Sequence, residues 1–245
     1  MIAPPTPRPP SRHLYGEHPT RRDGERRHTA LAQPDELPPV ATGGLRGVSF
    51  GAIILAAGLS SRMVENKVLL PWRDGKPIVR HVASQFVEAS IENVIVVTGR
   101  DAAKVRAAVD GLDVTCVHNS DFATGEMLSS VKAGLRALPA ELAGCFIQPA
   151  DMPAVPVEVI GQLAAAHEAG WNLAPRYEGR RGHPVLLDRA FWGAMLELPA
   201  DAKPRDVIEA ARERLRLVDV ADEGVLLDID TREAYERVLR MGRGI

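Results

Sequence analysis

The chain has 245 residues, of which 45% are hydrophobic and 25% charged, and its formal net charge is −2 at pH 7. This is the composition of an ordinary globular protein. It has no apolar run near the roughly 18 residues of a membrane span, and its near-neutral charge argues against a nucleic-acid-binding surface. Its two cysteines, Cys116 and Cys145, lie in apolar runs, which favours reduced core thiols and a cytoplasmic location over disulfides or a metal knuckle.

Residues 1–40 contain nine of the 19 prolines and many arginines, but few branched apolar residues. Such a segment cannot bury enough apolar surface to offset the entropy cost of ordering it. We therefore expect a disordered extension over residues 1–47 and a single folded domain over residues 48–245. The extension lacks the apolar stretch of a secretory signal, and its acidic residues argue against a transit peptide. A regulatory tail, an idle extension and a misplaced start codon all stay open.

From residue 50 onward, short apolar runs alternate with segments of helical period, which indicates βαβ units. The apolar runs predict strands near 51–56, 93–98, 113–118, 144–148, 171–175, 184–187 and 215–220. The segments between them predict helices at 77–90, 101–110, 127–138, 156–169, 189–198, 204–214 and 231–240. The predicted fold is a three-layer α/β/α sandwich with a mostly parallel, Rossmann-like sheet. In such a sheet, ligands bind beyond the carboxyl ends of the strands.

The loop after the first strand, LAAGLSSRM, is rich in small residues and is followed by Lys67. Small residues let backbone N–H groups approach an anion, and Arg62 and Lys67 would add positive charge, so a triphosphate site is one interpretation. A plain turn with two solvated charges is an equally good one. The loop has neither G-K-[ST] nor G-x-G-x-x-G, which counts against a P-loop ATPase and a nicotinamide dehydrogenase.

Five motifs in chain order resemble those of the MobA-like nucleotidyltransferases, and within them the molybdenum cofactor cytidylyltransferases. They span most of residues 51–235 and are LAAGLSSRM…NKVLLP, HN…G…SSV followed by AGL, QPADMP, GRRGHP and LDIDT. The resemblance implies a GT-A-like nucleotidyltransferase fold. The chain departs from the family at Val64 and Ala150, where glycine is common, and neither change removes a charged group.

The resemblance implies a nucleotide site built from residues that follow the strands. Arg62 and Lys67 would hold the phosphates and act in catalysis with Asp151. The other nucleotide-binding residues would be Leu55, Ala56, Ala57, Gly58, Thr98, Gly99, Asn119, Gly125 and Ser130. By spacing alone, a serine at a helix start such as Ser130 is more often an N-cap. The resembling guanylyltransferases tend to have glycine in place of Ala57, so the extra methyl group favours cytosine over guanine.

Acidic residues near the ends of two predicted elements are candidate metal ligands. Asp151 follows the strand GCFIQ, and a hard oxygen ligand at the carboxyl edge suits Mg²⁺; a helix cap is the alternative role. Asp228 and Asp230 are two apart on a predicted strand, so both would face the same side. By resemblance to the family's late acidic pair, Asp230 is the second Mg²⁺ ligand. Otherwise it would help to cap the last helix, a role that Thr231 can also fill.

The segment GRRGHP predicts a tight turn that enters a strand. Arg180 and Arg181 would bind the phosphate of the second substrate through bidentate contacts, and His183 is a further candidate for acceptor binding. An exposed basic hairpin tip, with His183 hydrogen-bonded to the backbone, is the other interpretation.

The activity that the resemblance implies is transfer of CMP from CTP to the terminal phosphate of molybdopterin or the molybdenum cofactor, with release of pyrophosphate. The attacking phosphate has its second ionisation near about pH 6, so it needs no general base. The partners would be CTP, the cofactor and a client molybdenum hydroxylase. The alternatives are another phosphorylated acceptor such as a sugar phosphate, GTP in place of CTP, or a non-catalytic carrier of the cofactor.

Overall fold

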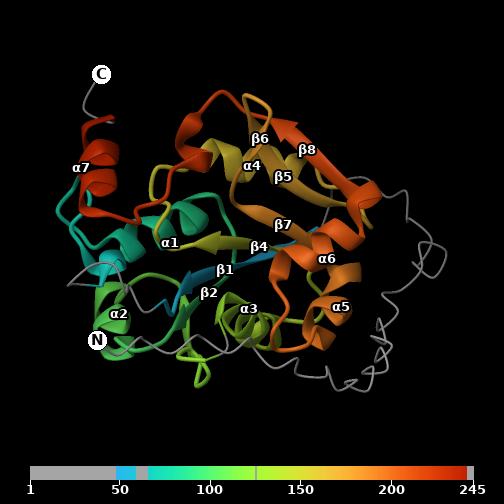
Figure 1. Ribbon diagram of the computed structural model, residues 1–245, viewed down its shortest axis with the longest axis horizontal. Helices are drawn as coiled ribbons and strands as arrows, with labels where there is room; N and C mark the ends of the chain where they lie inside the picture. Colours follow the sequence, from blue (N-terminus) through green and yellow to red (C-terminus); the bar gives the residue numbers. More distant parts are fainter. Residues whose placement is uncertain (1–47, 59–65, 125, 242–245) are drawn as a thin grey trace, which may run out of the picture. The chain divides into compact units, whose positions relative to one another are not determined.

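The computed structural model describes residues 48–58, 66–124 and 126–241. The predicted extension over residues 1–47 lies outside this part of the chain, so the domain boundary stays a prediction. Within the described residues, eight strands form one sheet with helices on both faces (Figure 1). None of the helices in these ranges combines the length and the apolar character that a membrane span requires.

The strands of this sheet are β1 (Phe50–Ala56), β2 (Asn93–Thr98), β3 (Thr115–His118), β4 (Gly144–Pro149), β5 (Asn172–Tyr177), β6 (Arg180–Arg181), β7 (Val185–Asp188) and β8 (Leu215–Asp219). They lie in the order β3-β2-β1-β4-β7-β5-β6, and β8 pairs with β5. Strands β1 to β4 are parallel, as are β5 and β8. Strand β7 is antiparallel to β4 and β5, and β6 is antiparallel to β5. The predicted sandwich with a mostly parallel sheet is confirmed.

The α-helices are α1 (Ile78–Glu88), α2 (Ala102–Ala108), α3 (Glu126–Ala137), α4 (Val157–Ala165), α5 (Trp192–Glu197), α6 (Pro204–Ala210) and α7 (Arg232–Met241). The short 3-10 helices within the described ranges are η2 (Lys67–Leu69), η3 (Arg189–Phe191), η4 (Arg212–Arg214) and η5 (Glu223–Leu226). Helices α1, α2, α4 and α7 contribute buried side chains to one apolar core, and α3, α5 and α6 contribute to the other.

Alternation along β1 explains why two cores form. Ala52 and Ile54 point to the core that contains Phe86 of α1, whereas Ile53 points to the core that contains Leu128 of α3. Successive side chains of a strand face opposite sides, and a central parallel strand is covered on both, so the whole run is apolar. The site therefore has to lie at the ends of the strands, where the covering helices stop.

The structure corrects three details of the sequence-based expectations. Residues 227–230 were predicted to lie on a strand but form none; among the described residues, one backbone bond, from the Ile229 N–H to the Asp151 carbonyl, ties them to the turn after β4. A short strand, β6, pairs with β5 within the segment that was predicted as a tight turn entering the next strand. The helix predicted over 189–198 begins as 3-10 helix η3, where the Asp188 side chain accepts a hydrogen bond from the Ala190 N–H.

Both cysteines are free thiols in the described structure, and Cys145 is fully buried whereas Cys116 is half-buried. Burial raises the pKa of each thiol above its ordinary value. A thiol with a raised pKa is a poor nucleophile and a poor metal ligand, so these residues behave as small apolar side chains.

Candidate active site

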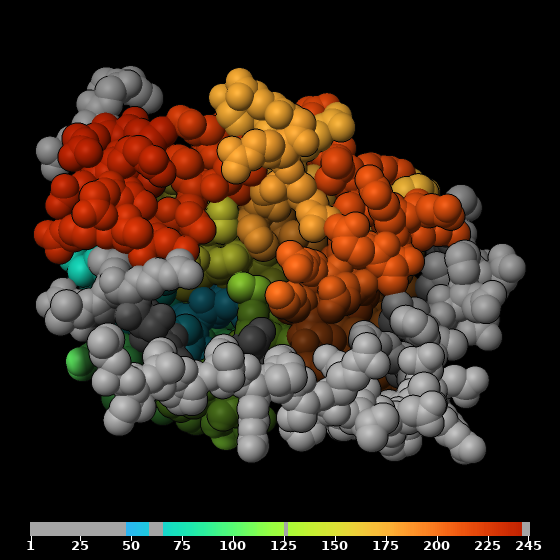
Figure 2. Space-filling view, in the orientation of Figure 1, coloured from blue at the N-terminus to red at the C-terminus, as the bar shows by residue number. Residues whose placement is uncertain are grey.

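The carboxyl ends of β1, β2, β3 and β4 meet at one edge of the sheet because these strands are parallel. The loops that follow them are joined by backbone hydrogen bonds from Ala150 N–H to the Leu55 carbonyl at 3.1 Å and from Asn119 N–H to the Thr98 carbonyl at 2.9 Å. In Figure 2, the blue atoms at the start of the described chain lie between the red C-terminal segment and the orange segment around α6. This edge collects most of the residues that the sequence motifs single out.

Lys67 and two aspartates form an ion-pair cluster at this edge. The Lys67 Nζ atom lies 2.5 Å from Asp151 Oδ2 and 2.7 Å from Asp230 Oδ1. The exposed fractions of the three side chains are 17%, 19% and 42%, respectively, so the cluster is partly shielded from water. Burial lowers the pKa of Lys67, but the charges and hydrogen bonds of Asp151 and Asp230 outweigh it, so the pKa lies above its ordinary value. The ammonium therefore stays charged at neutral pH.

The turn that carries Asp151 is held by the buried side chain of Gln148, which is 1% exposed. Its Nε2 donates to the carbonyls of Pro149 at 3.1 Å and Met152 at 3.3 Å, on either side of Ala150 and Asp151. Gln148 is the first residue of the motif QPADMP, but the sequence analysis predicted no role for it. A polar residue at the end of the buried apolar strand GCFIQ was the available signal, because a buried amide needs hydrogen-bond partners.

The two candidate acids of the segment LDIDT have different environments. Asp230 contacts Lys67, whereas Asp228 is exposed to solvent. The Thr231 Oγ1 atom accepts a hydrogen bond from the Ala234 N–H at 3.2 Å and so caps α7, the role that was the alternative for Asp230. The structure thus brings Asp230, rather than Asp228, to the side of Asp151.

The segment after Lys67 is tied to the last helix, α7. The Tyr235 hydroxyl donates to the Pro71 carbonyl at 2.5 Å, and the Arg73 guanidinium donates to the Val238 carbonyl at 3.3 Å. These contacts hold the segment that carries Lys67 against the segment that carries Asp230.

The first loop is described only at its two ends. Ala56 and Ala57 are buried, Leu55 is half-buried and Gly58 is exposed. Arg62 lies outside the described residues, with the rest of 59–65. A Cβ atom on Gly99 would lie 2.5 Å from the Ala57 carbonyl oxygen, so glycine lets the loops after β1 and β2 touch.

The predicted base-binding residues Thr98, Asn119 and Ser130 lie in one buried hydrogen-bonded cluster. The Thr98 hydroxyl donates to the Val117 carbonyl at 3.3 Å. The Asn119 Nδ2 atom lies 2.7 Å from Ser129 Oγ and 3.0 Å from Ser130 Oγ, and donates to both. Gly125 lies outside the described residues. The cluster joins the end of β3 to the start of α3 and so shapes the wall beside the first loop.

The predicted acceptor residues lie on and directly after β6, but they differ in exposure. Arg180 and Arg181 are exposed, and Arg181 donates to Glu209 Oε1 of α6 at 3.0 Å. His183 instead lies deeper: its N–H donates to the Val225 carbonyl at 2.9 Å, and its Nδ1 atom is buried without a hydrogen-bond partner in the described structure. Burial lowers the pKa of His183, against opposing effects of a hydrogen bond with the Ile147 backbone and, after it, of the Asp151 charge.

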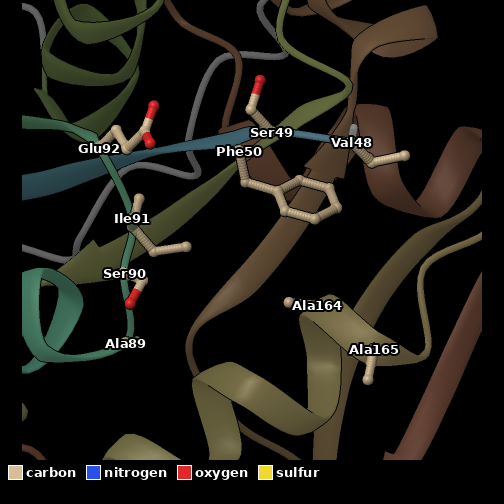
Figure 3. A pocket seen from close by; sticks show the side chains of 9 residues that line it. All are labelled: Val48, Ser49, Phe50, Ala89, Ser90, Ile91, Glu92, Ala164 and Ala165. Atoms are coloured by element: carbon tan, nitrogen blue, oxygen red, sulfur yellow. The ribbon is translucent and has the colours of Figure 1, made fainter. Parts of the chain in front are cut away.

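A separate pocket of about 350 Å³ lies at the opposite, amino-terminal end of β1 (Figure 3). The Phe50 ring and the Ile91 side chain border it, with Ala164 and Ala165 of α4 across the space, and Glu92 is the one charged residue among the described residues that line it. This hollow of mixed polar and apolar lining shares no residue with the Lys67 cluster, so it is distinct from the candidate active site.

The donor set of the cluster fits a hard divalent cation. Among the described residues, no group of three or more His, Cys, Asp or Glu side chains is placed to hold a metal ion without further ligands. Asp151 and Asp230 each aim a carboxylate oxygen at one point, that of Lys67 Nζ. Mg²⁺ commonly takes one or two protein carboxylates and completes its shell with phosphate oxygens and water.

A mostly parallel α/β sheet that carries a lysine and two carboxylates at the carboxyl edge of its parallel strands is compatible with an enzyme that acts on phosphates. The chain matches the MobA-like NTP transferase domain over residues 52–216 and belongs to that family, so the protein is a nucleotidyltransferase.

Two relatives with the same percentage identity to this chain are named for different activities. The chain is 29% identical over 184 residues to the molybdenum cofactor cytidylyltransferase of Escherichia coli (strain K12), covering 75% of this chain and 92% of that protein. It is also 29% identical over 196 residues to the nicotine blue oxidoreductase of Paenarthrobacter nicotinovorans, covering 76% of this chain and 95% of that protein.

A solved structure is similar over nearly its whole length. The crystal structure of Rv0371c from Mycobacterium tuberculosis H37Rv has a TM-score of 0.69 at 27% identity, covering 79% of this chain and 99% of that one. A second structure of Rv0371c is a complex with manganese, with a TM-score of 0.66 at 26% identity and coverage of 79% and 98%.

Proposed function

We propose that this enzyme transfers CMP from CTP to the terminal phosphate of molybdopterin or the molybdenum cofactor and releases pyrophosphate. The observation that carries the proposal is the meeting of the Lys67 ammonium with the Asp151 and Asp230 carboxylates at the carboxyl edge of the sheet. This charge set suits a triphosphate and its cation. Similarity to the Escherichia coli cytidylyltransferase over 92% of that protein supports the choice of nucleotide and acceptor.

In this proposal, Lys67 binds the β- and γ-phosphates of CTP, together with Arg62 from the loop outside the described residues. Asp151 and Asp230 would hold Mg²⁺, which supplies charge neutralisation and Lewis-acid polarisation of the phosphate oxygens when bound. The manganese complex of Rv0371c supports a divalent cation. The acceptor phosphate is already charged at neutral pH, so the protein has to position the reactants and offset their charge, and needs no general base.

The cytosine base of CTP would lie against the loop after β1 and against the hydrogen-bonded cluster of Thr98, Asn119 and Ser130. Leu55, Ala56, Ala57 and Gly58 would contribute backbone N–H groups, and the contact between Ala57 and Gly99 limits the space beside them. Thr98, Asn119 and Ser130 are bonded to the protein, so they would act by shaping this wall and by offering the remaining lone pairs of their oxygen atoms. A narrowed site favours the smaller cytosine ring over guanine.

The acceptor would lie on the side of the β5–β6 hairpin. His183 is the strongest candidate there, because its buried Nδ1 atom has no hydrogen-bond partner among the described residues. Arg180 is exposed and suits a phosphate, whereas Arg181 would have to leave Glu209. A molybdenum hydroxylase would be the client that receives the product in the cytoplasm.

Pyrophosphate release by the full-length protein tests the proposal. The assay compares CTP, GTP and ATP, each with Mg²⁺ and each with and without molybdopterin cofactor. Release that needs both CTP and the cofactor is the expected result. Equal or better turnover of GTP would overturn the base assignment, and CTP turnover with a sugar phosphate but not with the cofactor would overturn the acceptor assignment.

The equal identity to the nicotine blue oxidoreductase makes oxidation–reduction a second candidate. The same preparation incubated with nicotine blue and a reductant distinguishes the two. Conversion of the dye, together with no pyrophosphate release from any nucleotide, would favour the oxidoreductase. Binding of CTP without turnover on any acceptor would instead indicate a cofactor carrier.

A further inference from the structure

One lysine nitrogen fills the point on which the two candidate metal ligands converge. Lys67 Nζ is within 2.7 Å of a carboxylate oxygen of both Asp151 and Asp230. Oxygen ligands lie about 2.0–2.1 Å from Mg²⁺, so a divalent ion held by the same two oxygens would need the space that the ammonium fills. The ammonium and the divalent ion therefore compete for one position.

The ammonium also has an electrostatic reason to be there. Asp151 ends the turn after β4 and Asp230 precedes α7, so segments 79 residues apart bring two negative charges together. Two carboxylates aimed at one point repel each other unless a cation lies between them. Partial burial limits screening by water, which strengthens both this repulsion and the attraction to Lys67.

The lysine side chain is nevertheless able to leave without a change of the backbone. Lys67 is the first residue of η2, which is fixed by the Asn66 side chain at its start and by the buried Val68. Beyond Cα, the side chain is a flexible four-carbon stem with a compact charge. A triphosphate brings more negative charge than either carboxylate and would attract the ammonium towards itself.

We propose that Lys67 acts as an internal counter-ion that keeps divalent cations out of the Asp151–Asp230 pair in the nucleotide-free enzyme. This inference rests on the proposed function, in which the same pair holds the metal and Lys67 holds phosphates. It adds that the metal enters together with the triphosphate, because only then is the ammonium drawn away. Lys67 thus couples the binding of the two.

Binding of Mn²⁺ to the full-length protein without nucleotide tests this role with no dependence on activity. Free Mn²⁺ is followed by electron paramagnetic resonance in wild type, Lys67→Met, Lys67→Gln and Lys67→Arg. Both neutral variants should bind Mn²⁺ at least about tenfold more tightly than wild type, because a repelling charge is removed from the site. The variant Lys67→Arg keeps the positive charge, so its affinity for Mn²⁺ should stay as low as that of wild type.

Two controls separate this inference from the proposed function. Lys76→Met removes an exposed lysine that pairs with Asp74, and it should leave the Mn²⁺ affinity at the wild-type level. Asp151→Asn, added to Lys67→Met, should abolish the gain, which assigns the ion to this pair. Circular dichroism checks that each variant folds.

The outcomes are distinct. If Lys67→Met and Lys67→Gln bind Mn²⁺ no better than wild type while Asp151→Asn lowers the affinity of wild type, the counter-ion role is overturned and the metal site stands. If Mn²⁺ binding is the same with and without Asp151 in every background, both the counter-ion role and the metal assignment of the proposed function fail.

Discussion

The Ile229 N–H donates a 2.9 Å hydrogen bond to the Asp151 carbonyl, and this one backbone bond joins the two acidic segments of the site. Asp230 follows Ile229 directly, and Ile229 is fully buried. The backbone that carries the two carboxylates is therefore held in place by this hydrogen bond and by apolar packing, and Lys67 lies between the carboxylates themselves.

Removal of either charge should remove most of the activity. Asp151→Asn keeps the size of the side chain but loses the carboxylate, and we expect kcat to fall by ~10² or more, as for other losses of preorganised electrostatic stabilisation. Asp230→Asn should act in the same direction. Asp228→Asn is the matched control, because Asp228 is exposed and only two residues away. Steady-state pyrophosphate release checks all three, and a larger loss in Asp228→Asn than in Asp230→Asn would contradict the assignment.

The variant Gln148→Leu should test whether Gln148 positions the Asp151 carboxylate without taking part in CTP binding. It removes both hydrogen bonds to the turn around Asp151 and leaves the Pro149 and Met152 carbonyls without that donor. We expect the free energy of unfolding to fall by about 1–3 kcal/mol. We also expect kcat to fall with little change of KM for CTP, because the carboxylate is misplaced while the nucleotide contacts persist. Urea unfolding and kinetics at a temperature where the variant is folded measure the two effects; an unchanged kcat would leave Gln148 with a stabilising role only.

A methyl group at Gly99 should disturb the nucleotide site through the backbone. The added Cβ would lie 2.5 Å from the Ala57 carbonyl oxygen and 3.0 Å from Phe122 Cβ, so the loops after β1 and β2 must move apart. We expect Gly99→Ala to cost about 1–3 kcal/mol of stability and to raise KM for CTP. Gly161→Ala is the control, because its Cβ would meet nothing within 4 Å and a helical alanine should gain about 0.5–1 kcal/mol. Equal KM values for CTP in Gly99→Ala and Gly161→Ala would contradict a role of the contact between Gly99 and Ala57 in nucleotide binding.

Stability should fall on acidification, in part through His81. Burial lowers the pKa of His81 below its ordinary value of 6.5, although its Nε2 contact with the Pro153 carbonyl at 3.1 Å opposes the shift. The unfolded chain then takes up a proton at a higher pH than the folded protein, so the free energy of unfolding decreases as the pH falls below 6.5. His183 acts in the same direction.

The measurement is urea unfolding between about pH 7.5 and about pH 5.5 for wild type and His81→Gln. Glutamine keeps an N–H donor for the Pro153 carbonyl but does not ionise, so the variant should lose less stability over this range. An identical pH dependence in the two proteins would show that His81 does not contribute.

Much of the site could be predicted from the sequence because it follows the ends of parallel strands. Asp151 and Lys67 come after the apolar runs that form β4 and β1, and strands that run in the same direction deliver such residues to one edge. Asn119 and Ser130 were predicted as nucleotide-binding residues from the family resemblance, and the hydrogen bond between their side chains was not foreseen.

The rest of the candidate site could not be predicted, because it depends on contacts between distant segments that local sequence patterns do not encode. Lys67 and Asp230 are 163 residues apart, and no periodicity predicts that they touch. The alternation of LDIDT predicted a strand, which was wrong, because the pattern does not reveal whether a neighbouring strand is there to pair with these residues. The pairing of Arg181 with Glu209 likewise depends on where α6 packs, so two arginines that look equivalent in GRRGHP differ in the structure.

The contacts of Tyr235 with Pro71 and of Arg73 with Val238 have a consequence for synthesis of the chain. Asp230 and the helix that anchors its neighbourhood are among the last described residues, whereas Lys67 is among the first. A growing polypeptide lacks one of the two carboxylates of the site until this final stretch has emerged and docked. If Asp230 acts as proposed, a chain becomes catalytically competent only after translation has run through α7.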